Sequence, residues 1–130
     1  MTLVRHLIHH SRLWQGLLAL TVLAILYLAT AGSPRELPST GLDKINHLLA
    51  FAVLAVQWRL AFPRMRLVGV ILGLLGYGVL IELIQLPLPH RSAEGADVLA
   101  DALGVALGLG VHAVLMRCLP APASGRTQAS

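Results

Sequence analysis

Long apolar runs separated by short polar stretches make up most of this chain. The hydrocarbon core of a bilayer is about 30 Å thick and takes roughly 20 helical residues to cross. Runs close to that length cover residues 14–31, 43–62, 67–86 and 96–116. Helix-breaking residues close the first three, at Gly32-Ser33-Pro34, Pro63 and Pro87. The pattern predicts an all-α integral membrane protein with four transmembrane helices in a small bundle.

The composition of the 130 residues narrows the class of protein. Hydrophobic residues make up 56%, charged residues only 12%, and the mean hydropathy is +0.75. Such a chain has too little polar surface for a soluble domain and is too apolar to stay disordered. Its net charge of +4 comes from basic residues scattered between apolar runs. We therefore expect the chain to interact with membrane lipids and not with nucleic acid.

Basic residues give the chain a predicted orientation. Seven of the ten lie before the first run, around the second turn or after the fourth run: Arg5, Arg12, Arg59, Arg64, Arg66, Arg117 and Arg126. The other two loops hold Arg35, Lys44 and Arg91. By the positive-inside rule, both termini are expected in the cytoplasm. The chain then divides into a basic N-terminus (1–12), a membrane domain (13–117) and a disordered cytoplasmic tail (118–130).

The first run has a second interpretation. Basic residues precede it and Ala29-Thr30-Ala31 closes it, as in a cleaved signal peptide. The run is rather long for that role, and cleavage would leave the orientation of the other spans unchanged.

His6, His9 and His10 belong to the basic N-terminus and are expected on its surface. Trp14, Tyr27 and Trp58 fall near span ends, where they are expected at the membrane interface.

All six carboxylates lie in or beside the two loops predicted outside the cytoplasm. Counting helical rise from Leu67 places Glu82 about 22 Å into the third span, below the outer boundary. Asp97 and Asp101 are four residues apart and share a helix face, which continues through Gly104 and Gly108. That face is therefore the expected packing face of span four, because glycine lets a neighbouring helix approach closely.

The third span has the same two features. Glu82 and Gln85 are three residues apart, and Gly69, Gly73, Gly76 and Gly78 precede them, a stretch that also suits close helix contact. In the second span Asp43 and His47 are four apart. Three helices therefore aim polar residues at one place in the outer leaflet.

This polar group suits acid–base chemistry or ligand binding. The candidate catalytic residues are Asp43, His47, Glu82 and Asp97, and the candidate substrate-binding residues are Lys44, Gln85, Arg91 and Asp101. Glu82 lies at the negative end of its helix, so it must be protonated or paired with a cation. We expect Arg91 to be that cation, because its guanidinium can form two hydrogen bonds to a carboxylate.

Other functions remain open or fall away. The polar group could instead be a buried network that fixes helix register in a non-catalytic module binding a lipid or a partner protein. A divalent metal on His47 and the carboxylates is possible but not favoured, so no cofactor is expected. The sequence contains no phosphate loop, no serine nucleophile elbow and no CxxC pair. Nucleotide-driven transport, serine hydrolysis and redox chemistry therefore lack their usual motifs. Transport would require a homo-oligomer, which the sequence leaves possible.

The order and spacing of these residues resemble the VanZ-like family of small bacterial membrane proteins. The pattern runs from Asp43 to Gly108, about half the chain: Asp43-Lys44-Ile45-Asn46-His47, Phe51, Gly78, Glu82, Gln85, Pro89, Arg91, Asp97, Asp101, Gly104 and Gly108. Where Asp101 stands the family more often has Asn. The resemblance implies four membrane helices in the bacterial inner membrane and a link to glycopeptide resistance. A lipid-linked or other cell-envelope component is then the expected ligand or substrate.

Overall fold

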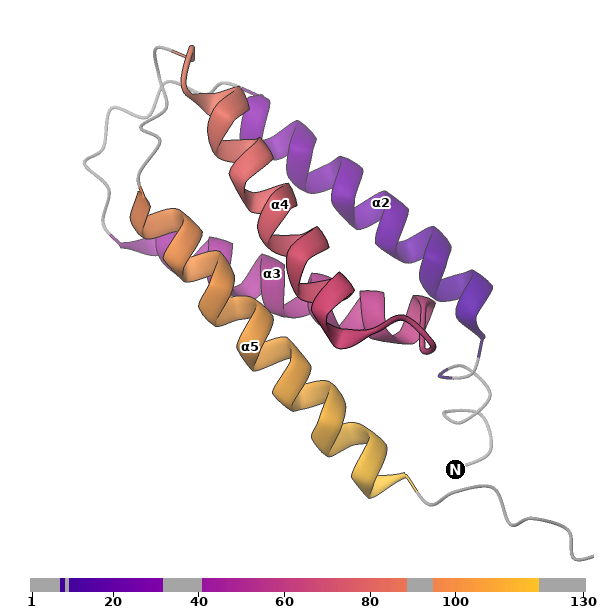
Figure 1. Ribbon diagram of the computed structural model, residues 1–130. Helices are drawn as coiled ribbons and strands as arrows, with labels where there is room; N and C mark the ends of the chain where they lie inside the picture. Colours follow the sequence, from indigo (N-terminus) through magenta and orange to yellow (C-terminus); the bar gives the residue numbers. More distant parts are fainter. Residues whose placement is uncertain (1–7, 9, 32–40, 89–94, 120–130) are drawn as a thin grey trace, which may run out of the picture.

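The computed structural model describes residues 8, 10–31, 41–88 and 95–119, and almost all of these residues are helical. The helices are α2 (Ser11–Thr30), α3 (Leu42–Ala61), α4 (Leu67–Gln85) and α5 (Gly95–Cys118). They alternate in direction, so α2 and α4 run one way and α3 and α5 the other (Figure 1). The prediction of an all-α chain with four long helices is confirmed, with helix ends within a few residues of the predicted spans.

Helices α2, α4 and α5 are each long and apolar enough to cross a membrane. Many of their large apolar side chains face outward, among them Leu20, Tyr27 and Val68 at 65–70% exposure, as expected for helices surrounded by lipid. Helix α3 is more polar because Asp43 and Lys44 stand in its first turn and Arg59 in its last. These charges lie at the two ends of the helix, where a span meets the interfaces.

The core of the bundle forms around α3. Phe51, Leu54 and Ala55 of this helix are at most 1% exposed, and they pack with apolar residues of the other three helices. The remaining members of this core are Leu18, Ala61, Val70, Leu74, Ile81 and Val105. Helix α3 thus forms the buried centre on which the more apolar helices are assembled.

Two glycines of α5 allow that helix to pack directly on the backbone of α3. A Cβ atom at Gly104 would collide with the carbonyl oxygen of Leu48, and one at Gly108 with that of Ala52. The predicted packing face of span four is therefore confirmed. The glycines of α4 are less uniform, because Gly73 and Gly78 meet neighbouring helices whereas Gly76 has nothing within 4 Å.

Helix α2 packs against the side of the core and also forms hydrogen bonds with α3 and α4. Within this helix only Leu18 is buried. Two side chains of α4 donate hydrogen bonds to its backbone, Tyr77 Oη to Val22 O at 2.6 Å and Gln85 Nε2 to Ala29 O at 3.1 Å. Gln15 of α2 donates in turn to Ala61 O of α3 at 3.2 Å. These three bonds add to the apolar contacts that four half-buried side chains of α2 make with the core.

Candidate functional site

Four buried or half-buried ionisable side chains meet where α3 and α5 begin and α4 ends. His47 stands in the second turn of α3, Asp97 and Asp101 in the first two turns of α5, and Glu82 in the last turn of α4. Exposure is 8% for Glu82, 7% for Asp97 and 1% for Asp101, and 21% for the His47 side chain. We call these four residues the polar cluster.

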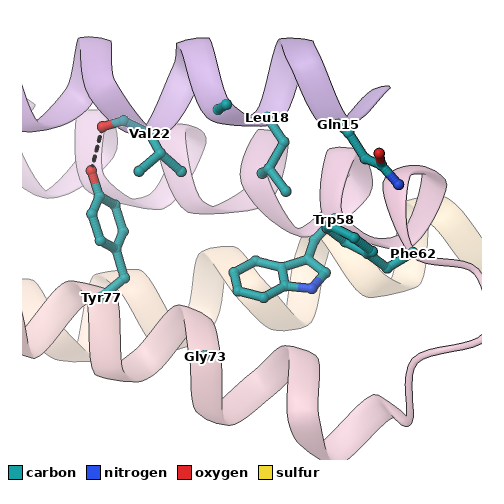
Figure 2. A pocket seen from close by; sticks show the side chains of 8 residues that line it. Gln15, Leu18, Val22, Trp58, Phe62, Gly73 and Tyr77 are labelled. Carbon is teal, nitrogen blue, oxygen red and sulfur yellow. Dashed lines mark hydrogen bonds between the residues drawn. The ribbon is translucent and has the colours of Figure 1, made fainter. Parts of the chain in front are cut away.

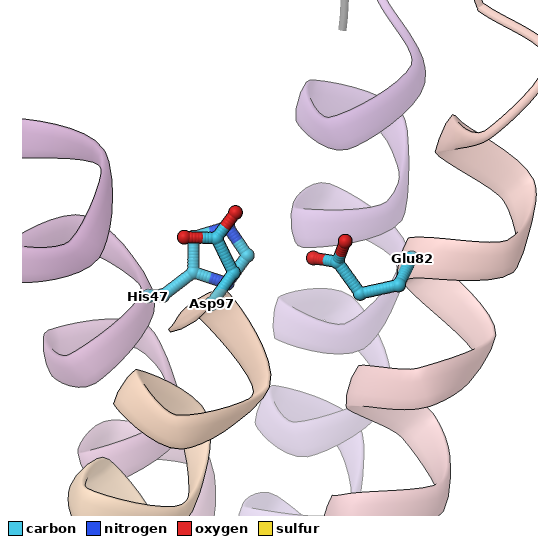
Figure 3. A group of neighbouring side chains, drawn as sticks. All are labelled: His47, Glu82 and Asp97. Atoms are coloured by element: carbon cyan, nitrogen blue, oxygen red, sulfur yellow. The ribbon is translucent and has the colours of Figure 1, made fainter. Parts of the chain in front are cut away.

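Three members of the polar cluster present metal-ligand atoms to one another. A ring nitrogen of His47 and carboxylate oxygens of Glu82 and Asp97 all lie within 4.8 Å of each other. Figure 3 shows the three side chains converging from three different helices. The predicted convergence of these residues is confirmed.

His47 and Asp101 form a direct contact between α3 and α5. Nδ1 of the imidazole lies 2.9 Å from Oδ1 of Asp101, within hydrogen-bond distance. With a proton on Nδ1 the ring donates to the carboxylate, which fixes the ring plane and leaves Nε2 as the free acceptor or ligand atom. Asp101 therefore orients His47.

Gly78 of α4 makes room for this aspartate. A Cβ atom there would stand 2.5 Å from Oδ2 of Asp101 and 3.4 Å from the ring of Phe51. The spacing of Gly78 suggested only close helix contact. The structure gives it the specific task of accommodating a carboxylate.

Two features of the polar cluster were not predicted from spacing. Asp101 is its most enclosed acid, at 1% exposure. The reason is that Asp101 points into the α3–α5 contact, where glycines bring the backbones together. The pairing of Asp101 with His47 was also not anticipated. Equal depth could have indicated it, since both residues stand in the second turn of helices that start at the same end of the bundle.

The remaining predicted site residues lie around the polar cluster. Asp43 and Lys44 are partly exposed in the first turn of α3, with Asp43 one turn before His47. Gln85 is buried and bonded to α2, and its role in substrate binding stays a prediction. Arg91 and its expected pairing with Glu82 lie outside the described residues.

A separate apolar pocket of about 360 Å³ lies between α2, α3 and α4, in the half of the bundle away from the polar cluster. It is lined by Gln15, Leu18, Ala19, Val22, Trp58, Phe62, Gly73 and Tyr77. Trp58, in the last turn of α3, lays its ring over Gly73 of α4 (Figure 2). Its Nε1 donates to Met65 Sδ at 3.1 Å, and its expected position at the membrane interface stays a prediction. Tyr77 packs on Phe51 with ring centroids 6.0 Å apart. Tyr77 thus lines the pocket, and the Phe51 ring lies beside Gly78, next to the polar cluster.

Chemically, the polar cluster offers one oriented imidazole and three carboxylates in a site shielded from solvent. Such a group can transfer protons, bind a cationic or hydrogen-bonding ligand, or coordinate a divalent ion through His47, Glu82 and Asp97. The fold and this site define a small multi-pass integral membrane protein that keeps a polar cluster among apolar helices.

The chain belongs to the VanZ/LLP1 family, whose pattern matches residues 3–116. The resemblance seen in the sequence is thereby confirmed, and the match extends through all four helices. No curated protein and no solved structure matches the chain at a significant level.

Proposed function

We propose that the polar cluster is an acid–base site that acts on a lipid-linked or other cell-envelope component at the outer face of the bacterial inner membrane. The observation that carries this proposal is the His47–Asp101 pair, buried against Glu82 and Asp97. Ionisable groups are costly within a membrane and usually serve a function there. A group of four from three helices is larger than helix register alone requires.

In this proposal His47 is the proton acceptor, because Asp101 holds its ring and stabilises the imidazolium that forms. Glu82 and Asp97 supply or take the second proton. Lys44 and Arg91 provide the positive charge that would hold a phosphate or pyrophosphate, the groups that lipid-linked precursors carry. A substrate with a lipid tail would approach such a site from within the bilayer.

A non-catalytic module is the second candidate, and one contact favours it. The His47–Asp101 bond crosses from α3 to α5 beside their closest approach, so it also helps to fix the register of the two helices. In that case the polar cluster would bind a lipid or a partner protein without changing it.

Substitutions that keep shape but remove the chemistry distinguish the two candidates. The test is complementation of a strain that lacks the gene. We expect the wild-type chain to return envelope integrity, or the level of glycopeptide sensitivity, to that of the parent strain. His47→Gln and Glu82→Gln should fail to do so while accumulating normally in the membrane. His112→Gln is the matched control, because it makes the same change eleven residues beyond Asp101 on α5, about 16 Å along the helix.

The outcome depends on the carboxylate itself. A network that serves only register tolerates the amide, which keeps the shape and still forms hydrogen bonds. Full function of Glu82→Gln would therefore remove Glu82 from the site. Arg91→Ala should damage the protein as much as Glu82→Ala, since either change breaks the expected pair.

A further inference from the structure

We propose that His47, Glu82 and Asp97 bind one divalent transition-metal ion, with Asp101 as the residue that positions His47. The three candidate ligand atoms lie within 4.8 Å of one another. Metal–ligand bonds of about 2.0–2.2 Å place ligands on opposite sides of an ion roughly 4 Å apart. Small side-chain rotations would therefore bring all three atoms onto one ion.

The donor set favours a particular kind of ion. One imidazole nitrogen and two carboxylate oxygens suit Zn²⁺ better than Mg²⁺ or Ca²⁺, which prefer oxygen alone. Three protein ligands leave at least one position open, as in catalytic rather than structural zinc sites. The ligands come from α3, α4 and α5, so the ion would also join three helices.

Asp101 supplies an independent argument. A histidine that binds metal through one nitrogen usually donates its other N–H to a carboxylate or a carbonyl, which fixes the tautomer and makes the ring a better ligand. His47 is within hydrogen-bond distance of Asp101 through Nδ1, at 2.9 Å. Asp101 is 1% exposed, and its Oδ2 accepts no hydrogen bond from the described residues. A carboxylate in this environment is stabilised when its imidazole partner carries the positive charge of a metal.

The local charge points the same way. Within the described residues, the polar cluster combines three buried carboxylates with one imidazole. Glu82 stands in the last turn of α4, where the helix dipole opposes a negative charge. A divalent cation would offset both the mutual repulsion of the carboxylates and this unfavourable dipole.

The use of the ion in chemistry rests on the proposed function. With the ion bound, His47, Glu82 and Asp97 would serve as its ligands and no longer as the proton-transfer groups of the metal-free site. The open position of the ion would then bind a phosphate oxygen of the substrate and polarise it. Binding of the ion itself does not depend on that function and can be measured directly.

The test uses the full-length chain, purified in detergent and stripped with a chelator, with Zn²⁺ as the probe. His6, His9 and His10 can themselves bind Zn²⁺, so all three are first replaced by alanine. We expect calorimetric titration and elemental analysis to give one ion per chain. His47→Gln, Glu82→Gln and Asp97→Asn should each weaken binding by about 100-fold or more, and His112→Gln should leave the affinity unchanged.

Substitutions of Asp101 distinguish a residue that positions His47 from one that binds the metal itself. Asp101→Leu should weaken binding by about 10- to 100-fold, and Asp101→Asn should recover part of that loss because its amide oxygen can still accept from Nδ1. The proposal is overturned if the chain with the three N-terminal replacements shows no saturable binding, or if His47→Gln binds as tightly as that chain. If the chain binds no metal and these variants still lose the phenotype, the metal-site proposal is wrong and the acid–base site is retained. Metal binding without any phenotype in the variants would support the ion and overturn the proposed function.

Discussion

At the scale of single residues, the largest unfavourable contribution to stability is the burial of the Asp101 carboxylate. Asp101 is almost fully enclosed, and its two oxygens face different neighbours, Oδ1 toward His47 and Oδ2 toward Gly78. Breaking a buried pair by removing one partner typically costs about 3–5 kcal/mol. Residues that hold Asp101 in place therefore also contribute to stability.

Gly78 provides a test of this positioning. We expect Gly78→Ala to displace Asp101 and break its bond to His47, because the new methyl group would stand 2.5 Å from Oδ2. The cost should be about 1–3 kcal/mol of stability, together with most of the function. Unfolding in detergent and complementation in cells would measure the two effects.

Gly76→Ala is the control for this change, since it adds the same methyl group to α4 with nothing within 4 Å. If Gly78→Ala acts through His47, its functional effect should not add to that of His47→Gln in the double variant. Additive effects would show that Gly78 serves another contact.

At the scale of helices, α3 and α5 form the pair that positions the polar cluster. Their backbones meet at Gly104 and Gly108, one and two turns beyond Asp101. In a membrane, such packing replaces the hydrophobic effect as the force that holds helices together. The contact also fixes which turn of α5 faces His47.

Alanine at these two glycines should separate the helices. Gly104→Ala and Gly108→Ala place a methyl group against backbone carbonyls of α3, which cannot move as a side chain can. We expect each to lose about 1–3 kcal/mol of stability. Gly110→Ala is the matched control on the same helix, because its Cβ would have nothing within 4 Å. Thermal unfolding in detergent gives the comparison, and equal melting temperatures for Gly104→Ala and Gly110→Ala would contradict it.

The sequence was informative about elements and less so about pairs. Run length and helix breakers predicted four helices, and residue spacing predicted that Asp97, Gly104 and Gly108 share a packing face. Spacing along one helix could not reveal partners on another, so the bond between His47 and Asp101 and the role of Gly78 emerged only from the structure. The contact between the Trp58 ring and Gly73 illustrates the same limit, because these two residues belong to different helices.

At the scale of the whole molecule, charge is divided between the two ends of the bundle. The start of α2, the α3–α4 turn and the end of α5 lie at one end (Figure 1). The described arginines all belong to segments at or next to this end: Arg12, Arg59, Arg64, Arg66 and Arg117. The polar cluster lies toward the opposite end, where α3 and α5 begin.

This separation supports the expected topology, with both termini in the cytoplasm and the polar cluster toward the outer face. Arginines near the ends of spans resist translocation, whereas carboxylates contribute little to orientation. A phosphatase reporter, active only outside the cytoplasm, should therefore be inactive when fused after Arg117 and active when inserted at residue 40, in the segment between α2 and α3. A fluorescent reporter that matures only in the cytoplasm should give the reverse pattern. Phosphatase activity after Arg117 would invert the bundle and place the polar cluster at the cytoplasmic face, away from any substrate confined to the outer leaflet.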